Sequence, residues 1–132
     1  MLPVLLIMLM GVLDIGRMYF AFVAIQNAAG EGALYAAINP KCIHATDGPE
    51  CADPSNAEYR AKHESPSGQI DWTRITINVE PVDRSTLREG DPITIYVRYQ
   101  YDILTPVIAA IVKDGKLTLT ARAVQDVLDL EQ

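Results

Sequence analysis

The first 38 residues constrain this chain more than any other segment, because they are too apolar to open an ordinary globular domain. Every residue from Met1 to Leu13 is apolar, proline or glycine, and the apolar character resumes after Asp14 and Arg17. One α-helix over residues 2–38 would be about 55 Å long, whereas the hydrocarbon core of a bilayer is about 30 Å thick. We therefore predict a long helix whose first half suits a membrane and whose second half has another task.

Small residues recur at helical spacing in the second half of this predicted helix. They form two neighbouring rows: Ala24, Ala28, Gly32 and Ala36 in one, and Ala29, Ala33 and Ala37 in the other. Rows of small side chains let another backbone approach closely, as in membrane helix pairs and in ridge-and-groove packing. We predict that other elements pack against this half, and we assign the first row, with Asp14 and Arg17, to an assembly helix.

Asp14 and Arg17 interrupt the apolar run, and their i,i+3 spacing places them on the same side of a helix. A charge at bilayer depth costs roughly 2.5–3.5 kcal/mol, so such residues usually pair or face protein. One interpretation is that the two residues pair within the helix or between the helices of an assembly. The other is that Arg17 marks the membrane–water interface and extends toward water. The sequence leaves both interpretations open.

The part of the chain after the helix, residues 39–132, is acidic, with 15 acidic and 10 basic residues. An acidic surface argues against nucleic acid as a partner. The chain has no nucleotide-binding, serine-hydrolase or zinc-protease motif, and its two histidines, His44 and His63, lie in polar surroundings. We therefore predict no catalytic, cofactor-binding or metal-binding residues, no small-molecule substrate and no enzymatic activity.

Apolar and polar residues alternate in three later segments, which predicts strands over residues 73–82, 93–101 and 117–123. A short helix is predicted over residues 55–64, with its first turn capped from Asp53–Ser55. The apolar segment 104–112 contains a proline and is predicted to form a turn and a short helix.

Three strands with one apolar face each need a cover, and the small-residue half of the first helix is the available one. The predicted fold class is therefore α+β: a long N-terminal helix packed, through its C-terminal half, against a small antiparallel sheet of about three strands. We predict two units, an N-terminal hydrophobic assembly helix (1–38) and a globular domain (39–132).

The N-terminal segment resembles the TadE-like family, the pilin-like proteins of tight-adherence pilus systems. The resemblance is carried by LPVLLIMLMGVLDIGRMYFAF followed by NAAGEGALYAA, and it covers roughly the first 38 residues. Gly30 and Leu34 stand where the family often has arginine. The family also has a basic leader before the apolar run, and a signal peptide would need one as well. We therefore expect that a segment upstream of Met1 has been removed or lies outside the printed sequence.

The resemblance implies a structural subunit of an extracellular pilus-like filament, assembled through the N-terminal helix. Its partners would be copies of itself or other pilins, and the helix would anchor the chain in the inner membrane before assembly. A second possibility is a minor membrane-anchored pseudopilin needed for assembly of the pilus. A third, of another class, is a membrane-tethered domain that binds a ligand. The pilin-like architecture also implies that the sheet packs over the half of the helix that lies outside the membrane.

Cys42 and Cys51 lie nine positions apart in a loop-like segment. A domain outside the cytoplasm favours a disulfide between them, and two reduced thiols are the alternative. Several oxygen-bearing residues share this loop: Asp47, Glu50, Asp53 and Asn56. They lack the spacing of a calcium-binding EF-hand, so a solvated acidic loop is the favoured interpretation.

Overall fold

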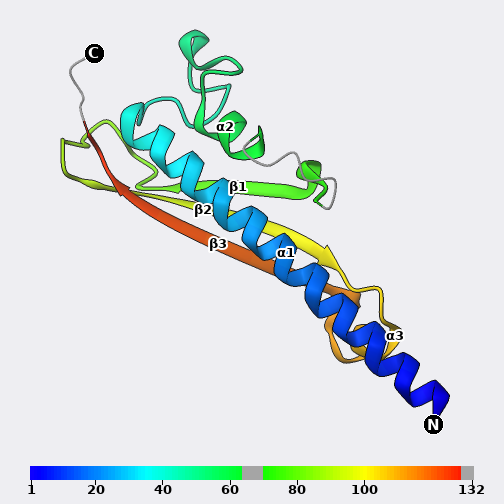
Figure 1. The fold of residues 1–132 in the computed structure, drawn as a ribbon. Coiled ribbons are helices and arrows are strands. Elements are labelled where there is room, and N and C mark those ends of the chain that lie inside the picture. Colours follow the sequence, from blue (N-terminus) through cyan, green and yellow to red (C-terminus); the bar gives the residue numbers. More distant parts are fainter. Residues whose placement is uncertain (64–69, 129–132) are drawn as a thin grey trace.

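The computed structural model describes residues 1–63 and 70–128 as an elongated molecule, in which one long helix lies across a three-stranded sheet (Figure 1). The helices and strands follow in the order α1 (Leu2–Ile38), α2 (Ala57–His63), β1 (Ile75–Glu80), β2 (Pro92–Asp102), α3 (Pro106–Ile111) and β3 (Lys116–Asp126). Three single-turn 3₁₀ segments connect them: Pro49–Cys51, Trp72–Arg74 and Lys113–Gly115.

Helix α1 is continuous over 37 residues, as predicted. A proline stands in its first turn, where the missing N–H costs no hydrogen bond. The helix ends at Asn39, whose N–H donates to the carbonyl oxygen of Tyr35 at 2.8 Å. Pro40 follows and disfavours further helix.

The sheet has the strand order β1-β2-β3, and both pairings are antiparallel. Its register places Ile77 opposite Val97, and Tyr99 opposite Leu119. Strand β1 starts two residues later than predicted, because Asp71 accepts a hydrogen bond from the N–H of Thr73 at 3.0 Å and stabilises a 3₁₀ turn there. The α+β class with a three-stranded antiparallel sheet is therefore confirmed.

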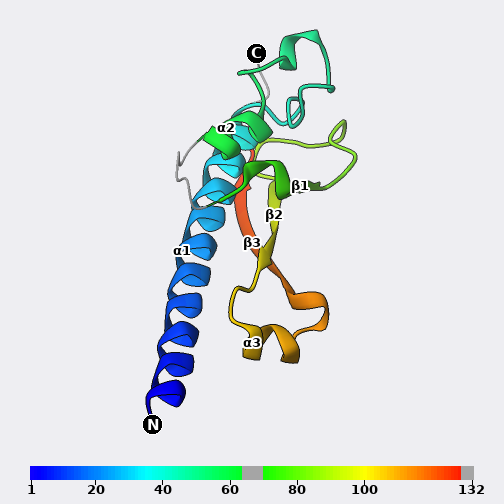
Figure 2. The ribbon, with the colours of Figure 1, turned by 90° about the vertical axis from the view of Figure 1, so that its right-hand side faces the viewer.

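The core lies between the second half of α1 and one face of the sheet, and α2 packs against the C-terminal part of α1 (Figure 2). The small residues of α1 pack against β2 and β3, and among the fully buried members of the core are Ala29, Ala33, Ile93, Ile95 and Val97. At the far end, the N–H of Leu128 donates to the carbonyl oxygen of Ala37 at 3.1 Å. The second half of α1 thus belongs to the core of the globular domain.

Helix α2 is capped by Asn56 rather than by Asp53–Ser55 as predicted. The Asn56 side-chain oxygen accepts from the N–H of Tyr59 at 2.7 Å, while its amide nitrogen donates to Asp53 at 2.7 Å and to the carbonyl oxygen of Cys51 at 3.0 Å. The buried Asn56 therefore fixes both the helix start and the loop before it. The predicted helix end at residue 64 lies outside the described residues.

Candidate functional site: the apolar half of the long helix

The first half of α1 is exposed and apolar on all sides. All residues from Met1 to Leu13 are exposed except Gly11, which is half-buried. Among the described residues, α1 is the one helix long and apolar enough to cross a membrane, and only 11% of its most apolar window is buried. The core helix of a water-soluble protein would be mostly buried, and the first half of α1 differs from such a helix in its exposure.

The small-residue row of α1 is used inside the chain. Ala24, Ala28, Gly32 and Ala36 are all buried, and they pack toward the sheet and α2. A Cβ added at Gly32 would lie 3.3 Å from the Cβ of Ala61, so the two helices approach closely. In this conformation the small-residue row packs against the sheet and α2 of its own chain. The first half of the helix is the surface left for other chains.

Asp14 is buried, and it pairs with Thr105 rather than with Arg17. The N–H of Thr105 donates to the Asp14 carboxylate at 2.7 Å, and the Thr105 hydroxyl donates to the same oxygen. Thr105 is the N-cap residue of α3, but its hydroxyl donates to Asp14 and makes no capping hydrogen bond to the first turn of α3. We refer to this pair as the Asp14–Thr105 clasp. No local sequence pattern indicates this pair, because the partners lie 91 positions apart.

The clasp ties the start of α3 to the apolar half of α1, and in Figure 1 α3 lies at the level of that half. The Cδ1 atom of Ile108 lies 3.9 Å from where a Cβ on Gly11 would be, and the Thr105 hydroxyl lies 3.4 Å from the carbonyl oxygen of Met10. The predicted short helix in segment 104–112 is present. Its docking onto α1 was not predicted.

Arg17 is exposed, one turn of helix from the clasp. It lies near Tyr101, an inward-facing residue of β2 that is 5% exposed and whose hydroxyl has no partner among the described residues. Burial raises the pKa of Tyr101, and the Arg17 guanidinium opposes this rise. Arg17 therefore stands at the boundary between the apolar half of the helix and the domain core.

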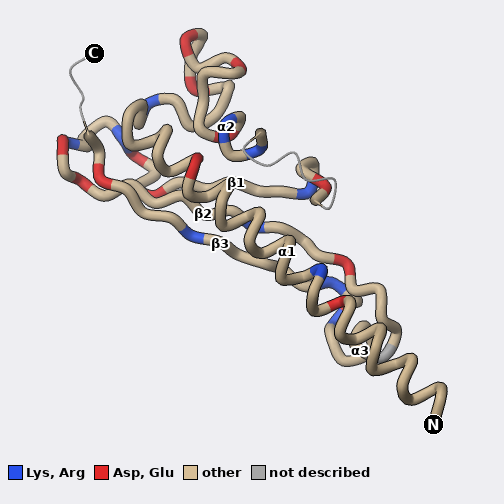
Figure 3. The backbone as a smooth tube through the Cα atoms, in the orientation of Figure 1, with Lys and Arg blue, Asp and Glu red and all other residues tan. Residues whose placement is uncertain are grey.

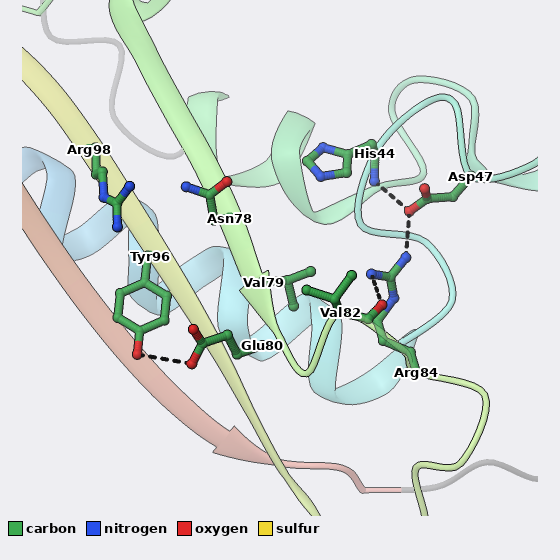
Figure 4. A pocket seen from close by; sticks show the side chains of 9 residues that line it. All are labelled: His44, Asp47, Asn78, Val79, Glu80, Val82, Arg84, Tyr96 and Arg98. Carbon is green, nitrogen blue, oxygen red and sulfur yellow. Dashed lines mark hydrogen bonds and ion pairs between the residues drawn. The ribbon is translucent and has the colours of Figure 1, made fainter.

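Charged side chains are concentrated away from the N-terminal end of the molecule (Figure 3). An open groove of about 640 Å³ lies among them, between the loop at His44 and strands β1 and β2 (Figure 4). Three of its charged side chains have partners: Arg84 donates to Asp47 at 3.2 Å, and the Tyr96 hydroxyl donates to Glu80 at 3.2 Å. The groove offers no arrangement typical of a catalytic site.

The two histidines are engaged separately. His44 Nδ1 lies 2.7 Å from a Glu58 carboxylate oxygen, while the His63 ring stacks on Tyr59 with centroids 3.8 Å apart. Within the described ranges 1–63 and 70–128, no group of three or more His, Cys, Asp or Glu side chains is placed to hold a metal ion.

Cys42 and Cys51 form a disulfide, with their Cα atoms 5.0 Å apart. The enclosed loop is further held by Asp47, whose carboxylate accepts from the N–H groups of Ile43 and His44 at 2.9 Å each. Asp47 and Asn56, two of the oxygen-bearing residues of this loop, are thus engaged in local hydrogen bonds. The loop is closed by the disulfide and lies at the end of the molecule far from Met1 (Figure 1).

Comparison with known proteins gives one match. The family model described as TadE-like protein matches residues 1–34, which lie almost entirely within α1. No curated protein and no solved structure matches the chain. TadE-like proteins are a structural, pilus-associated family rather than an enzyme family, and the exposed apolar helix fits a pilin-like protein of such a system. The N-terminal segment of this chain is therefore TadE-like, as its sequence resemblance implied.

Proposed function

We propose that this chain is a structural subunit of an extracellular pilus-like filament, held together by the apolar half of α1. The observation that carries the proposal is that residues 1–13 are apolar on every side and that all of them except Gly11 are exposed. Neither the sheet nor α2 covers them. Burying apolar surface gains about 25 cal/mol per Å², so several neighbouring helices would stabilise an assembly strongly.

The same surface serves two states of the chain in this proposal. Before assembly, the apolar half of α1 anchors the chain in the inner membrane, since it is apolar enough for a bilayer. After assembly, it contacts the helices of other copies or of other pilins, and the acidic domains coat the outside of the filament. The assembly helix (1–38) and the domain (39–132) then have separate tasks, although the second half of α1 lies in the domain core.

A second candidate is a minor pseudopilin, present in few copies at a tip or base of the pilus. One observation favours it: α3 covers one side of α1 at Gly11 and leaves fewer sides for neighbouring helices. A helix surrounded by other subunits at that level would have to displace α3. The two candidates predict different positions along a pilus.

Electron microscopy of sheared surface material, with gold-labelled antibody against the 39–132 domain, tests the proposal. A filament subunit predicts label along the whole length, whereas a minor subunit predicts label at one end. If the chain stays in the membrane fraction and is absent from sheared filaments, the structural role is wrong. A strain without the chain supplies the control for antibody specificity.

A further inference from the structure

The turn between β2 and β3 is apolar, exposed and unlike the rest of the domain surface. We refer to residues 103–117, which include α3, as the hairpin tip. Helix α3 contains no charged residue. Leu104, shortly before it, is 66% exposed, and Ile111, its last residue, is 82% exposed. In water, this surface is unfavourable.

The hairpin tip lies at the level of the apolar half of α1. Ile108 packs beside Gly11, and Thr105 is bonded to Asp14. Figures 1 and 2 both place α3 at the level of the N-terminal half of α1, at the opposite end of the molecule from α2. Any apolar medium that surrounds residues 1–13 of α1 therefore also reaches α3.

The charges of the hairpin tip differ in sign from those of the whole chain. Lys113, Asp114 and Lys116 give the tip one net positive charge, whereas the chain has a net charge of −6. Arg17 is a further exposed cation, one turn after the clasp. An apolar surface bordered by cations suits the boundary between acyl chains and anionic headgroups.

We infer that the hairpin tip is a second membrane contact, in which α3 lies in the headgroup region of an anionic bilayer beside α1. The inference rests on the membrane-anchored state in the proposed function. The Asp14–Thr105 clasp sets the depth: Asp14 and Arg17 stand at the water side, and α3 enters the acyl boundary with Leu104 and Ile111. A lipid surface is favoured over a second copy because the tip joins apolar and cationic groups at the edge of a membrane-compatible helix.

Tryptophan fluorescence of the full chain in vesicles tests this inference. In a Trp72→Phe background, Ile111→Trp reports on the tip, and Val82→Trp is the matched control, since both native residues are 82% exposed. Leu5→Trp reports on α1. The vesicles contain phosphatidylcholine and phosphatidylglycerol with bromine placed either near the headgroup or deep in the acyl chain.

We expect the headgroup-proximal bromine to quench Ile111→Trp at least about twofold more than Val82→Trp. Leu5→Trp is expected to respond more to the deep bromine, because it lies about 9 Å from the level of Gly11 along the helix. Equal quenching of Ile111→Trp and Val82→Trp by aqueous iodide, with no effect of bromine, would overturn the inference. So would shielding of Ile111→Trp from both quenchers, which would mean that protein covers the tip.

The Leu5→Trp signal distinguishes a failure of the membrane anchor from a failure of the second membrane contact. If Leu5→Trp is quenched by lipid and Ile111→Trp is not, the membrane anchor stands and only the second contact is wrong. If Leu5→Trp is not quenched, the membrane-anchored state is wrong, and the second contact is wrong with it.

Discussion

Asp14 is the residue at which the two halves of α1 meet. On its N-terminal side the helix is exposed and apolar, and on its C-terminal side the helix enters the domain core. A buried carboxylate needs hydrogen bonds, and Thr105 supplies two donors to one of its oxygens. Asp14 therefore belongs to the fold of the single chain, whatever additional part it plays in assembly.

Substitution Asp14→Ala is expected to loosen the hairpin tip without unfolding the sheet. The change leaves the N–H and hydroxyl of Thr105 without their acceptor, at a local cost of about 1–3 kcal/mol. Hydrogen exchange should show faster exchange of the Thr105 amide, while the amides of β1 stay protected.

Two variants at Thr105 give the control for this prediction. Thr105→Ser keeps both donors to Asp14, so the amide of residue 105 should exchange at the native rate. Thr105→Val removes the hydroxyl, so its amide should exchange at a rate between those of the native chain and Asp14→Ala. Unchanged exchange in Asp14→Ala would show that the clasp does not hold the tip.

Glu58 is expected to make the stability of α2 and of the loop before it depend on pH. Burial raises the pKa of Glu58, but hydrogen bonds from Lys62 at 2.5 Å and His44 at 2.7 Å outweigh it, so the pKa lies below its usual range. The folded state therefore binds protons less readily than the unfolded state, where the pKa of glutamate is about 4.3. The stabilisation is present above that pH and is lost as pH falls through the lower folded pKa.

Thermal unfolding between pH 6 and pH 3 (about the range in which carboxylates titrate) checks this expectation. The native chain should lose more thermal stability on acidification than Glu58→Gln, which has no carboxylate to protonate. The exposed Glu89→Gln serves as a control and should follow the native curve. Identical pH profiles for the native chain and Glu58→Gln would contradict the role of Glu58.

The helix α1 depends on small residues where other elements cross it closely. Gly32 lies under α2, and a side chain there would meet Ala61 and the carbonyl oxygen of Ala57. Gly32→Leu is therefore expected to lower the free energy of unfolding by about 1–3 kcal/mol through overpacking. Urea unfolding of the full chain in detergent, followed by Trp72 fluorescence, measures the loss.

Leu34 provides the contrast on the same helix. It is 43% exposed, so Leu34→Ala should change the free energy of unfolding much less than Gly32→Leu does. If both substitutions lowered the free energy of unfolding equally, close packing of α2 at Gly32 would not be the limiting feature.

Elements with a clear periodicity were predictable from the sequence, and contacts between distant segments were not. The alternation in β1 and β2 and the rows of small residues in α1 reflect local geometry, so they predicted strands and a packed helix face. The Asp14–Thr105 clasp depends on a fold that brings residues 91 positions apart together. The Asn56 cap was missed because Asp53 and Ser55 are equally good capping residues, and only tertiary contacts select among them.

The whole molecule has two chemically different ends. The N-terminal half of α1 and the hairpin tip form an apolar end, and the disulfide loop, α2 and most charged residues form the opposite end (Figure 3). The α1–sheet core joins them into one elongated body. This polarity suits a subunit that is first held in a membrane by one end and later buries that end among its neighbours.

Cross-linking through α1 tests whether the apolar halves of neighbouring α1 helices contact one another in the filament. Leu9→Cys places a thiol on the apolar half, where Leu9 is 55% exposed, and Val82→Cys places one on the domain. Cys42 and Cys51 are already paired, so a short bismaleimide reacts only with the new thiol. Sheared filaments carrying either variant are treated and separated by mass.

We expect most Leu9→Cys chains in sheared filaments to become covalent dimers, because neighbouring helices lie against one another, and we expect Val82→Cys chains to stay monomeric. Leu9→Cys chains that are present in filaments and remain monomeric would contradict assembly through the apolar half of α1.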